Sequence, residues 1–488
     1  MQQLSGVDAS FLHMETGTTF GHVCGVVLLD GRTSSGQPLT AAEVERVVQQ
    51  RLPLMPPLRR RLVEVPFGLE RPYWVNDPDF DLSFHVRELA LPRPGGREQL
   101  AEQVARIAAR PLDRRHPLWE LYVISGLEDG GVALLVKVHH AAVDGVAAVE
   151  LISTLLDRTP DPGAPAPPSD DWRPERLPSP VEMWWRGLAG LSVQPLKALE
   201  LQGRAMRALP RSLRFHGRSA APAIGGVARR LTGGGSPDGG LLNRPPVVAP
   251  RTPFNRPITA HRRWAYGTTP LPAVKQVKNA FGVTVNDVVM AGCAGGLRRW
   301  LQAHDALPDG PLVAMVPVSI RSAEQQGAFG NRVSAMLAAL PTHLADPVDR
   351  LRAAHEGMRA AKEQHAALDA EVLQDIARFA APALATRAAR VAAQLRLADV
   401  VNPPFNLVVS NVPGPREPLY LAGARVRAYL PVSVVADGLG LNITVQSYLD
   451  NLDVGLVACR ELVPDLWDLL GMVLESFDEL ATAAHAQA

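Results

Sequence analysis

Apolar residues recur along positions 20–156 with two different spacings, which indicates that strands and helices alternate there. Positions 132–138 carry apolar side chains at every second residue, which is the period of a strand. Positions 41–51 repeat valine at helical spacing. The same reasoning predicts a short strand over 23–29 and a helix over 100–109, so this part of the chain is expected to form one α/β unit.

A second set of alternating elements follows residue 257. We expect helices within 275–300, 346–364 and 464–480, and strands over 312–319, 405–410 and 441–459, the last as a hairpin that turns at Asp450-Asn451. No internal repeat is visible in the sequence. The pattern therefore predicts a second α/β half.

The stretch between the two halves differs from both in composition. From Asp157 to about Pro257 it is rich in proline and glycine, which is typical of a long connection. We therefore divide the chain into an N-terminal lobe of residues 1–157, an interdomain connection of residues 158–257 that includes some helix, and a C-terminal lobe of residues 258–488.

Within this connection, residues 186–230 hold nine basic residues and one acidic residue, Glu200, for a local charge of +8. Trp184 and Trp185 stand just before this stretch. Basic segments with interleaved apolar residues are typical of attachment to an anionic membrane or lipid-droplet surface. The alternative is a solvated basic helix that packs across the junction of the two lobes.

Composition adds few constraints. The 488 residues are 47% hydrophobic and 20% charged, with a net charge of +1, which favours two or three globular domains and gives no indication of nucleic-acid binding. The three cysteines, Cys24, Cys293 and Cys459, are odd in number and far apart, so no disulfide framework is expected. No signal peptide or membrane-spanning segment is visible, and we expect a cytoplasmic protein.

The most informative chemistry lies directly after the apolar run 131–138, where the chain has the pattern HHxxxDG. In it, His139 and His140 follow the strand, and their side chains are expected to point to opposite sides. A histidine at a strand end can act as a general base on a hydroxyl, because its pKa lies near neutral pH. Adjacent histidines on a strand cannot easily share one metal ion, so a zinc site is not expected.

The last two positions of the pattern suit a helix start. Asp144 is a residue type favoured at helix N-caps, and Gly145 permits close approach of the backbone. The sequence has no GxSxG elbow, no phosphate-binding loop, no HExxH and no paired CxxC. The chemistry is therefore expected to need no metal and no bound cofactor.

Further motifs carry a resemblance that covers nearly the whole chain. They are LSGVDASFL at 4–12, DPDFD at 77–81 with HVR at 85–87, PLDRRHPLWE at 111–120, HHAAVDG at 139–145, Asn286-Asp287, PVSIR at 317–321, GNR at 330–332 and SNVPGP at 410–415. In this order and number they resemble those of the bacterial wax ester synthase/diacylglycerol acyltransferases. HHxxxDG alone would indicate only the wider superfamily of chloramphenicol acetyltransferase and peptide-synthetase condensation domains. One departure is Phe20-Gly21 before His22, where Pro-Met would be expected, and it bears on the wall of an acyl tunnel.

The resemblance implies a fold and an activity. The fold is α/β with mixed sheets, as in chloramphenicol acetyltransferase and condensation domains, with two lobes and an interlobe tunnel. The activity is an O-acyltransferase that makes triacylglycerol from diacylglycerol, or wax ester from a long-chain fatty alcohol. Long-chain acyl-CoA would enter from one face as co-substrate and the acceptor alcohol from the other.

The resemblance also implies roles for the residues of the HHxxxDG motif. His140 is the candidate general base, which takes the proton of the acceptor hydroxyl, whereas His139 is assigned structural support, with a second catalytic imidazole as the rival role. Asp144 is expected to form an ion pair with an arginine, and the sequence does not choose among the candidates, which are Arg51, Arg59 and Arg321. A side chain at Gly145 would obstruct the substrate.

Residues of the second half complete the expected site. Asn286 is a candidate to stabilise the oxyanion or to orient His140, because an amide can donate a hydrogen bond to developing charge. Asp287 is expected to cap a helix that begins at Val288. The SNVPGP segment is expected to shape the tunnel floor, with four residues assigned to substrate binding: Ser410, Asn411, Pro413 and Gly414.

Two other functions stay open from the sequence. One is acyl transfer from a carrier-bound thioester in complex-lipid or natural-product assembly. The other is a non-catalytic lipid-surface protein that keeps the fold. The intact His140 argues against the second, and the sequence does not fix the acceptor, the acyl chain length or the oligomeric state.

Overall fold

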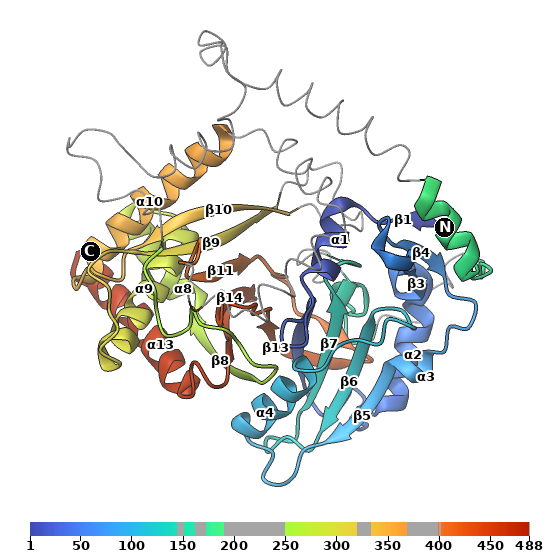
Figure 1. Cartoon of the computed structure of the whole chain (residues 1–488). Coiled ribbons are helices and arrows are strands. Elements are labelled where there is room, and N and C mark those ends of the chain that lie inside the picture. The colour runs from blue at the N-terminus through green and yellow to red at the C-terminus, as the bar shows by residue number, and fades with distance from the viewer. Residues whose placement is uncertain are drawn as a thin grey trace, which may run out of the picture.

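The computed structural model describes residues 1–143, 151–161, 172–189, 249–319, 333–367, 399 and 402–487. These residues form two six-stranded mixed sheets and one small three-stranded sheet. Figure 1 shows the two large sheets next to each other, each with its own helices. This arrangement confirms the mixed α/β fold with two halves.

The first sheet has the strand order β12-β13-β2-β7-β6-β5. Four of its strands come from the N-terminal half: β2 (His22–Leu29), β5 (Val86–Ala90), β6 (Trp119–Ser125) and β7 (Val132–His139). Helix α2 (Ala41–Arg51) and helix α4 (Arg97–Ala108) contribute to apolar clusters on opposite faces. Strand β7 is buried on both faces, which explains why its sequence is apolar almost throughout.

The second sheet has the order β10-β9-β11-β14-β15-β8. Its strands are β8 (Arg262–Pro270), β9 (Leu312–Ser319), β10 (Val333–Leu340), β11 (Leu407–Val412), β14 (Leu441–Tyr448) and β15 (Asn451–Cys459). Its helices are α8 (Leu271–Phe281), α9 (Val285–Ala303), α10 (Pro347–Ala367) and α13 (Leu466–Gln487). These helices share one apolar core with the sheet.

One strand of the C-terminal half, with a short neighbour, completes the first sheet, which the division at residue 257 does not anticipate. Strand β13 (Ala424–Val432) and the short β12 (Tyr420–Leu421) belong to the first sheet, where β13 pairs antiparallel with β2. Strand β13 also contacts the second sheet, since the Tyr429 N–H donates to Asp453 at 3.0 Å and the Trp264 indole donates to the Pro431 carbonyl at 3.1 Å. The lobe boundary therefore follows the sheets and not the order of the chain.

A small layer covers one edge of the first half. The strands β1 (Gln2–Gln3), β4 (Tyr73–Asn76) and β3 (Arg60–Val63) form its sheet, in that order. Close to it lies α1 (Gly6–His13), and Figure 1 places α1 between this layer and the second sheet. Short helices complete this region: α3 (Leu82–His85) and the 3-10 turns Leu52–Leu54, Pro56–Arg59 and Pro66–Gly68.

Most elements expected from the pattern are confirmed to within a few residues, and α2 and β9 have the expected bounds. The start predicted for the helix after Asp144 lies outside the described residues. Residues 151–154 are helical. The cysteines are free, as expected.

No single helix of the described part of the chain is long and apolar enough to cross a membrane. Only α8 and α9 taken together reach that length, and they are bent by 105° relative to each other.

Candidate active site

The second histidine of the HHxxxDG motif lies just beyond the end of β7. The His140 N–H donates to the Gly21 carbonyl at 2.8 Å, which fixes the backbone at this point. Its imidazole stacks on the ring of Phe11, with centroids 4.1 Å apart and planes inclined by only 3°. Phe11 lies on α1, whose first turn is closed by a capping box between Ser5 and Asp8. The half-buried imidazole is therefore held in one plane by a neighbouring helix.

The first histidine is buried and has different partners. His139 Nδ1 accepts a hydrogen bond from the Ala141 N–H at 3.0 Å, and Nε2 lies 3.2 Å from Glu15. Because Nδ1 accepts this hydrogen bond, Nε2 is the ring nitrogen that carries a proton towards the Glu15 carboxylate. These contacts support the structural role that the sequence assigns to His139.

Glu15 connects the segment after α1 to the motif. Its carboxylate accepts from the Gly21 N–H at 2.8 Å and from Arg114 at 2.7 Å, in addition to His139. Burial by itself raises the pKa of Glu15, but the hydrogen bonds and charges of His139 and Arg114 bring it down to about 2. The carboxylate is therefore ionised at neutral pH and holds three parts of the chain together.

Sequence reasoning missed Phe11, Glu15 and Gly21 as parts of this site. Phe11 belongs to the N-terminal motif, and Glu15 follows it within a turn, but neither carries a spacing that points to a histidine far along the chain. Gly21 replaces the expected methionine of the family pattern. A Cβ added there would lie 2.8 Å from His139 Nε2 and 2.9 Å from the Phe11 carbonyl, so a side chain would require a shift of the site.

Asp144, Gly145 and Arg321 lie outside the described residues. Of the other candidate partners of Asp144, Arg51 forms an ion pair with Asp157 and donates to the backbone of residue 154. Arg59 is buried, and its guanidinium lies 4.9 Å above the ring of Trp172. The pairing of Asp144 with an arginine stays a prediction.

The Asn286-Asp287 pair lies in the first turn of α9. The helix begins at Val285 and not at Val288, with Thr284 as its N-cap. Asp287 therefore caps the helix from the third position. Its carboxylate accepts from the Thr284 N–H at 2.8 Å, and its own N–H donates to the Thr284 hydroxyl oxygen at 3.3 Å. The same carboxylate lies 2.8 Å from His355 Nδ1 on α10, which joins the two helices.

Two residues of the expected site, Asn286 and Asn411, lie next to each other here. The Asn411 amide lies 3.5 Å from the side-chain oxygen of Asn286, and Asn286 in turn lies 3.9 Å from the Met358 sulfur. Asn411 and Ser410 belong to β11, which runs parallel to β14. The role of Asn286 towards the oxyanion or His140 stays a prediction.

The end of the SNVPGP segment is fixed by the neighbouring strand. The Gly414 N–H donates to the Ser447 hydroxyl at 3.1 Å, and a Cβ at Gly414 would lie 1.9 Å from the Ser447 carbonyl. Only glycine permits this approach. Pro413, just before it, is exposed.

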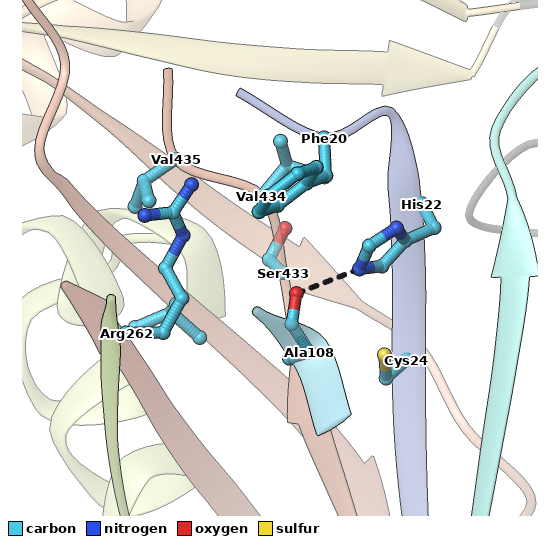
Figure 2. A pocket seen from close by; sticks show the side chains of 9 residues that line it. Phe20, His22, Cys24, Ala108, Arg262, Ser433, Val434 and Val435 are labelled. Atoms are coloured by element: carbon cyan, nitrogen blue, oxygen red, sulfur yellow. Dashed lines mark hydrogen bonds between the residues drawn. The ribbon is translucent and has the colours of Figure 1, made fainter. Parts of the chain in front are cut away.

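A narrow pocket lies beside the motif, at the junction of the two halves (Figure 2). Strands from both sheets line it, with Phe20, His22 and Cys24 on one side and Arg262 and residues 433–435 on the other. His22 is the direct neighbour of His139 in the β2–β7 ladder. The pocket therefore opens one strand away from the HHxxxDG motif.

The polar side chains that line this pocket are the His22 imidazole, the Arg262 guanidinium, the Ser433 hydroxyl and the Cys24 thiol. Burial, together with the charge of Lys137, holds the pKa of His22 well below its ordinary value, and its Nε2 lies 2.8 Å from the Ala108 carbonyl. Arg262 donates to the backbone carbonyls of Thr18 and Thr259, and burial lowers its pKa to about 10. Arg262 thus carries the positive charge of this wall.

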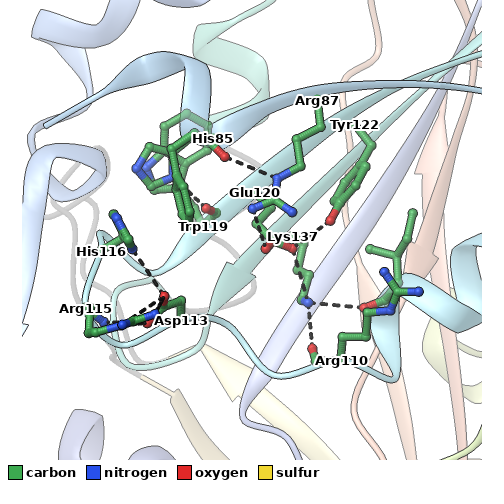
Figure 3. Close-up of polar contacts among 12 residues, drawn as sticks. His85, Arg87, Arg110, Asp113, Arg115, His116, Trp119, Glu120, Tyr122 and Lys137 are labelled. Carbon is green, nitrogen blue, oxygen red and sulfur yellow. Dashed lines mark hydrogen bonds and ion pairs between the residues drawn. The ribbon is translucent and has the colours of Figure 1, made fainter.

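A buried polar cluster forms around Lys137 of β7 (Figure 3). Lys137 is fully buried, donates to the Ile107 and Arg110 carbonyls at 3.1 and 2.6 Å, and lies 3.4 Å from Glu120. Tyr122 donates to the same carboxylate at 3.0 Å. The cluster ties the end of α4 to β6 and β7, two residues before His139.

The PLW segment packs beside this cluster. The Trp119 indole donates to the Leu58 carbonyl at 2.8 Å, and its ring stacks on His85 at 4.4 Å. Asp113 pairs with Arg115, and Arg114 pairs with Glu15 and Glu64.

Among the described residues no group of three or more metal-ligating side chains is placed to hold a metal ion.

The sequence matches known proteins along most of its length. The sequence model described as "Wax ester synthase/diacylglycerol acyltransferase catalytic domain" matches residues 4–289, and the one described as "WS/DGAT C-terminal domain" matches residues 329–481. A putative diacylglycerol O-acyltransferase of Mycobacterium tuberculosis is 37% identical over 100% of this chain and 91% of its own length.

Solved structures show the same fold. The wax ester synthase/diacylglycerol acyltransferase from Marinobacter aquaeolei VT8 is 31% identical, with a TM-score of 0.69 over 99% of this chain and 100% of that one. The first condensation domain of the calcium-dependent antibiotic synthetase, at 15% identity, has a TM-score of 0.58 over 99% of this chain and 96% of that one.

Fold and motif together define a two-lobed acyltransferase of the HHxxxDG type. The chain belongs to the wax ester synthase/diacylglycerol acyltransferase family.

Proposed function

We propose that this enzyme transfers the acyl group of a long-chain acyl-CoA to the hydroxyl of diacylglycerol or of a long-chain fatty alcohol, giving triacylglycerol or wax ester. The observation that carries the proposal is His140, which follows a buried strand, is half-buried and is held against Phe11. An imidazole with a fixed plane and partial access to solvent is suited to take a proton from a bound alcohol.

The reaction needs one proton shuttle. His140 removes the proton of the acceptor hydroxyl, whose oxygen attacks the thioester carbonyl. The carbon–sulfur bond then breaks, and the imidazolium returns the proton to the CoA thiolate. Asn286 is proposed to donate to the oxyanion, a contribution of roughly 3 kcal/mol where such donors have been removed. Acyl-CoA is the only co-substrate, and no metal or bound cofactor is needed.

The test follows thiol release by the full chain supplied with palmitoyl-CoA and either dipalmitoylglycerol or hexadecanol. His140→Ala is expected to lower the turnover number by about 10²–10⁴. The control is His485→Ala on the exposed end of α13, which should leave turnover unchanged. No thiol above background with any alcohol or amine, or full turnover by His140→Ala, would remove the proposal.

A second arm of this test concerns the acyl donor. The same acyl group is supplied on a carrier protein through pantetheine. We expect CoA to be preferred, and a preference for the carrier would favour complex-lipid or natural-product assembly.

The proposed location is the cytoplasm, with reversible association with a membrane or lipid-droplet surface, because both acceptors partition into lipid. Binding to liposomes without any acyl transfer would instead favour a non-catalytic lipid-surface protein.

A further inference from the structure

One helix of the connection is packed firmly on the first half. Residues 180–189 are helical, and Ser179 and Glu182 cap the first turn reciprocally, at 2.7 and 3.2 Å. The segment before the helix is attached to β4 through Glu175, which exchanges hydrogen bonds with the backbone of Asn76. Met183 is buried, and a Cβ at Gly187 would lie 2.8 Å from the Val65 side chain. The helix therefore packs against the first half through the face that carries Met183 and Gly187.

Its outer face is apolar. Val181, Trp184, Trp185 and Leu188 follow one another at the i, i+3, i+4 and i+7 spacing, which places them on one side of a helix. Val181 is 64% exposed, Trp184 38% and Trp185 62%, and the two tryptophan rings meet edge to face at 5.0 Å. A helix on the surface of a water-soluble protein normally presents polar side chains on this side.

A third aromatic residue is exposed close to the place where this helix packs on the first half. Phe67 lies in the turn Pro66–Gly68, between Val65 and Leu69, the two residues on which Gly187 packs. It is 77% exposed and has a φ of 59°, a conformation that costs a residue with a side chain about 1 kcal/mol or more. Phe67, Val181, Trp184 and Trp185, which we call the aromatic patch, are four of the eight large apolar side chains that are exposed among the described residues.

The charge of the sequence that follows this helix favours an anionic membrane as the binding partner of the aromatic patch. The chain continues from the helix into the stretch 186–230, with its nine basic residues and one acidic residue. Its first residue, Arg186, is exposed on the helix itself. A protein partner matched to an apolar patch would not require this excess of positive charge, whereas an anionic bilayer supplies apolar depth and negative charge together. Tryptophan is also one of the residue types that are enriched at membrane interfaces.

We propose that the aromatic patch inserts into the interfacial region of an anionic phospholipid membrane, with the exposed Arg186 of the same helix at the headgroups. The inference extends the lipid-surface association proposed above. It does not depend on the acyltransferase activity, and it assigns membrane binding to specific residues. Figure 1 shows this helix at the edge of the first half, far from α13, so that the membrane would meet that edge of the molecule.

The test measures binding of the full chain to vesicles of phosphatidylglycerol and phosphatidylcholine by flotation and by tryptophan emission. The wild type is expected to float with the vesicles at low salt and to show a blue shift of its emission. The triple variant Phe67→Ser/Trp184→Ser/Trp185→Ser is expected to bind at least about tenfold more weakly. The matched control is Leu337→Ser, which removes an exposed apolar side chain from β10 in the other half and should bind as the wild type does.

Two further measurements keep the result interpretable. Circular dichroism shows whether the triple variant is folded. For the wild type alone, quenching of tryptophan emission by lipids brominated near the headgroup reports insertion without any mutation. Failure of the wild type to float, equal binding by the triple variant, or absence of quenching would each overturn the inference.

The assay of thiol release separates this inference from the proposed function. Turnover of a short-chain acyl-CoA with a water-soluble alcohol should be unchanged in the triple variant. If the wild type binds vesicles but shows no turnover, the acyltransferase proposal is wrong and the membrane-binding inference stands. If it shows turnover but does not bind vesicles, the membrane-binding inference is wrong and the acyltransferase proposal stands.

Discussion

At the scale of single residues, His140, the proposed general base, depends on side chains that are distant in sequence. Phe11 fixes the plane of His140, and Glu15 holds His139 and the Gly21 backbone. None of these contacts belongs to the strand pairing of the first sheet. Their common effect is to fix the short segment that follows β7, so the consequences of removing them should appear in the chemistry as well as in stability.

Replacing Phe11 should affect the rate more than binding. In Phe11→Ala the imidazole loses its stacking partner, and we expect kcat to fall by about tenfold to a hundredfold with little change in KM, because a misplaced base loses orientation. Phe11→Tyr keeps the ring and should retain most of kcat. Steady-state kinetics checks both variants, and a change confined to KM would contradict the positioning role.

Replacing Glu15 should have a pH-dependent effect on stability. Its pKa in the folded protein, about 2, lies below the ordinary value of 4.5. The ionised carboxylate therefore contributes stability that is fully present above pH 4.5 and is lost as the pH falls towards 2. Glu15→Gln should lower the free energy of unfolding at pH 7 by up to about 3 kcal/mol. Denaturant unfolding at pH 7 and pH 3 checks this, and a difference that does not shrink at pH 3 would contradict it.

At the scale of elements, α9 shows how one helix terminus can serve both folding and function. Its capping box fixes the first turn, Asp287 binds His355 of α10, and the neighbouring Asn286 meets Asn411 at the end of β11. Further along, glycines bring α9 close to α13, since a Cβ at Gly296 would lie 2.4 Å from Val473. The helix is thus fixed at its start and along its length.

Removing the cap should weaken this helix in a non-additive way. Asp287→Ala and Thr284→Ala are each expected to cost about 1–2 kcal/mol of unfolding free energy. Because the two residues share one capping box, the double variant should cost less than the sum of the single variants. Asp287→Asn keeps a hydrogen-bond acceptor and should be milder than Asp287→Ala. Strict additivity in denaturant unfolding would mean that the two side chains do not act together.

At the scale of the whole molecule, the two halves form one structure because β13 belongs to the first sheet and packs on the second. Val104 of α4, Leu135 of β7 and Trp264 of β8 also lie in one apolar cluster that joins the halves. The pocket beside His22 lies at this junction. The relative placement of the halves therefore determines the shape of the space next to the motif.

Gly455 provides a test of this junction. A Cβ there would lie 2.1 Å from the Pro431 carbonyl of β13, a backbone atom that cannot move without shifting the strand. We expect Gly455→Ala to lower the free energy of unfolding by about 2 kcal/mol or more and to reduce turnover. Gly471→Ala on α13 is the control, because its added Cβ meets open space and alanine favours a helix by about 1 kcal/mol. Equal stability of the two variants would contradict a tight junction.

Sequence periodicity predicted most of the strands and helices, because burial of alternate or helically spaced residues is a local property. It did not reveal that residues 420–432 complete the first sheet, since a strand's own pattern does not specify its neighbour. The motif and the family resemblance pointed to His140 and to the Asn286-Asp287 pair. Phe11 and Glu15 were missed because their role depends on a contact across more than 100 residues of chain.

Strand β13 is translated long after β2, its partner in the first sheet, and this order affects folding during synthesis. Strand β2 ends at Leu29, and its partner begins about 400 residues later, at Ala424. As the nascent polypeptide leaves the ribosome, one edge of β2 has no native partner until translation is almost finished. Premature termination would therefore leave an unpaired hydrophobic strand edge, and truncated products should aggregate or be degraded rather than accumulate as a stable N-terminal fragment.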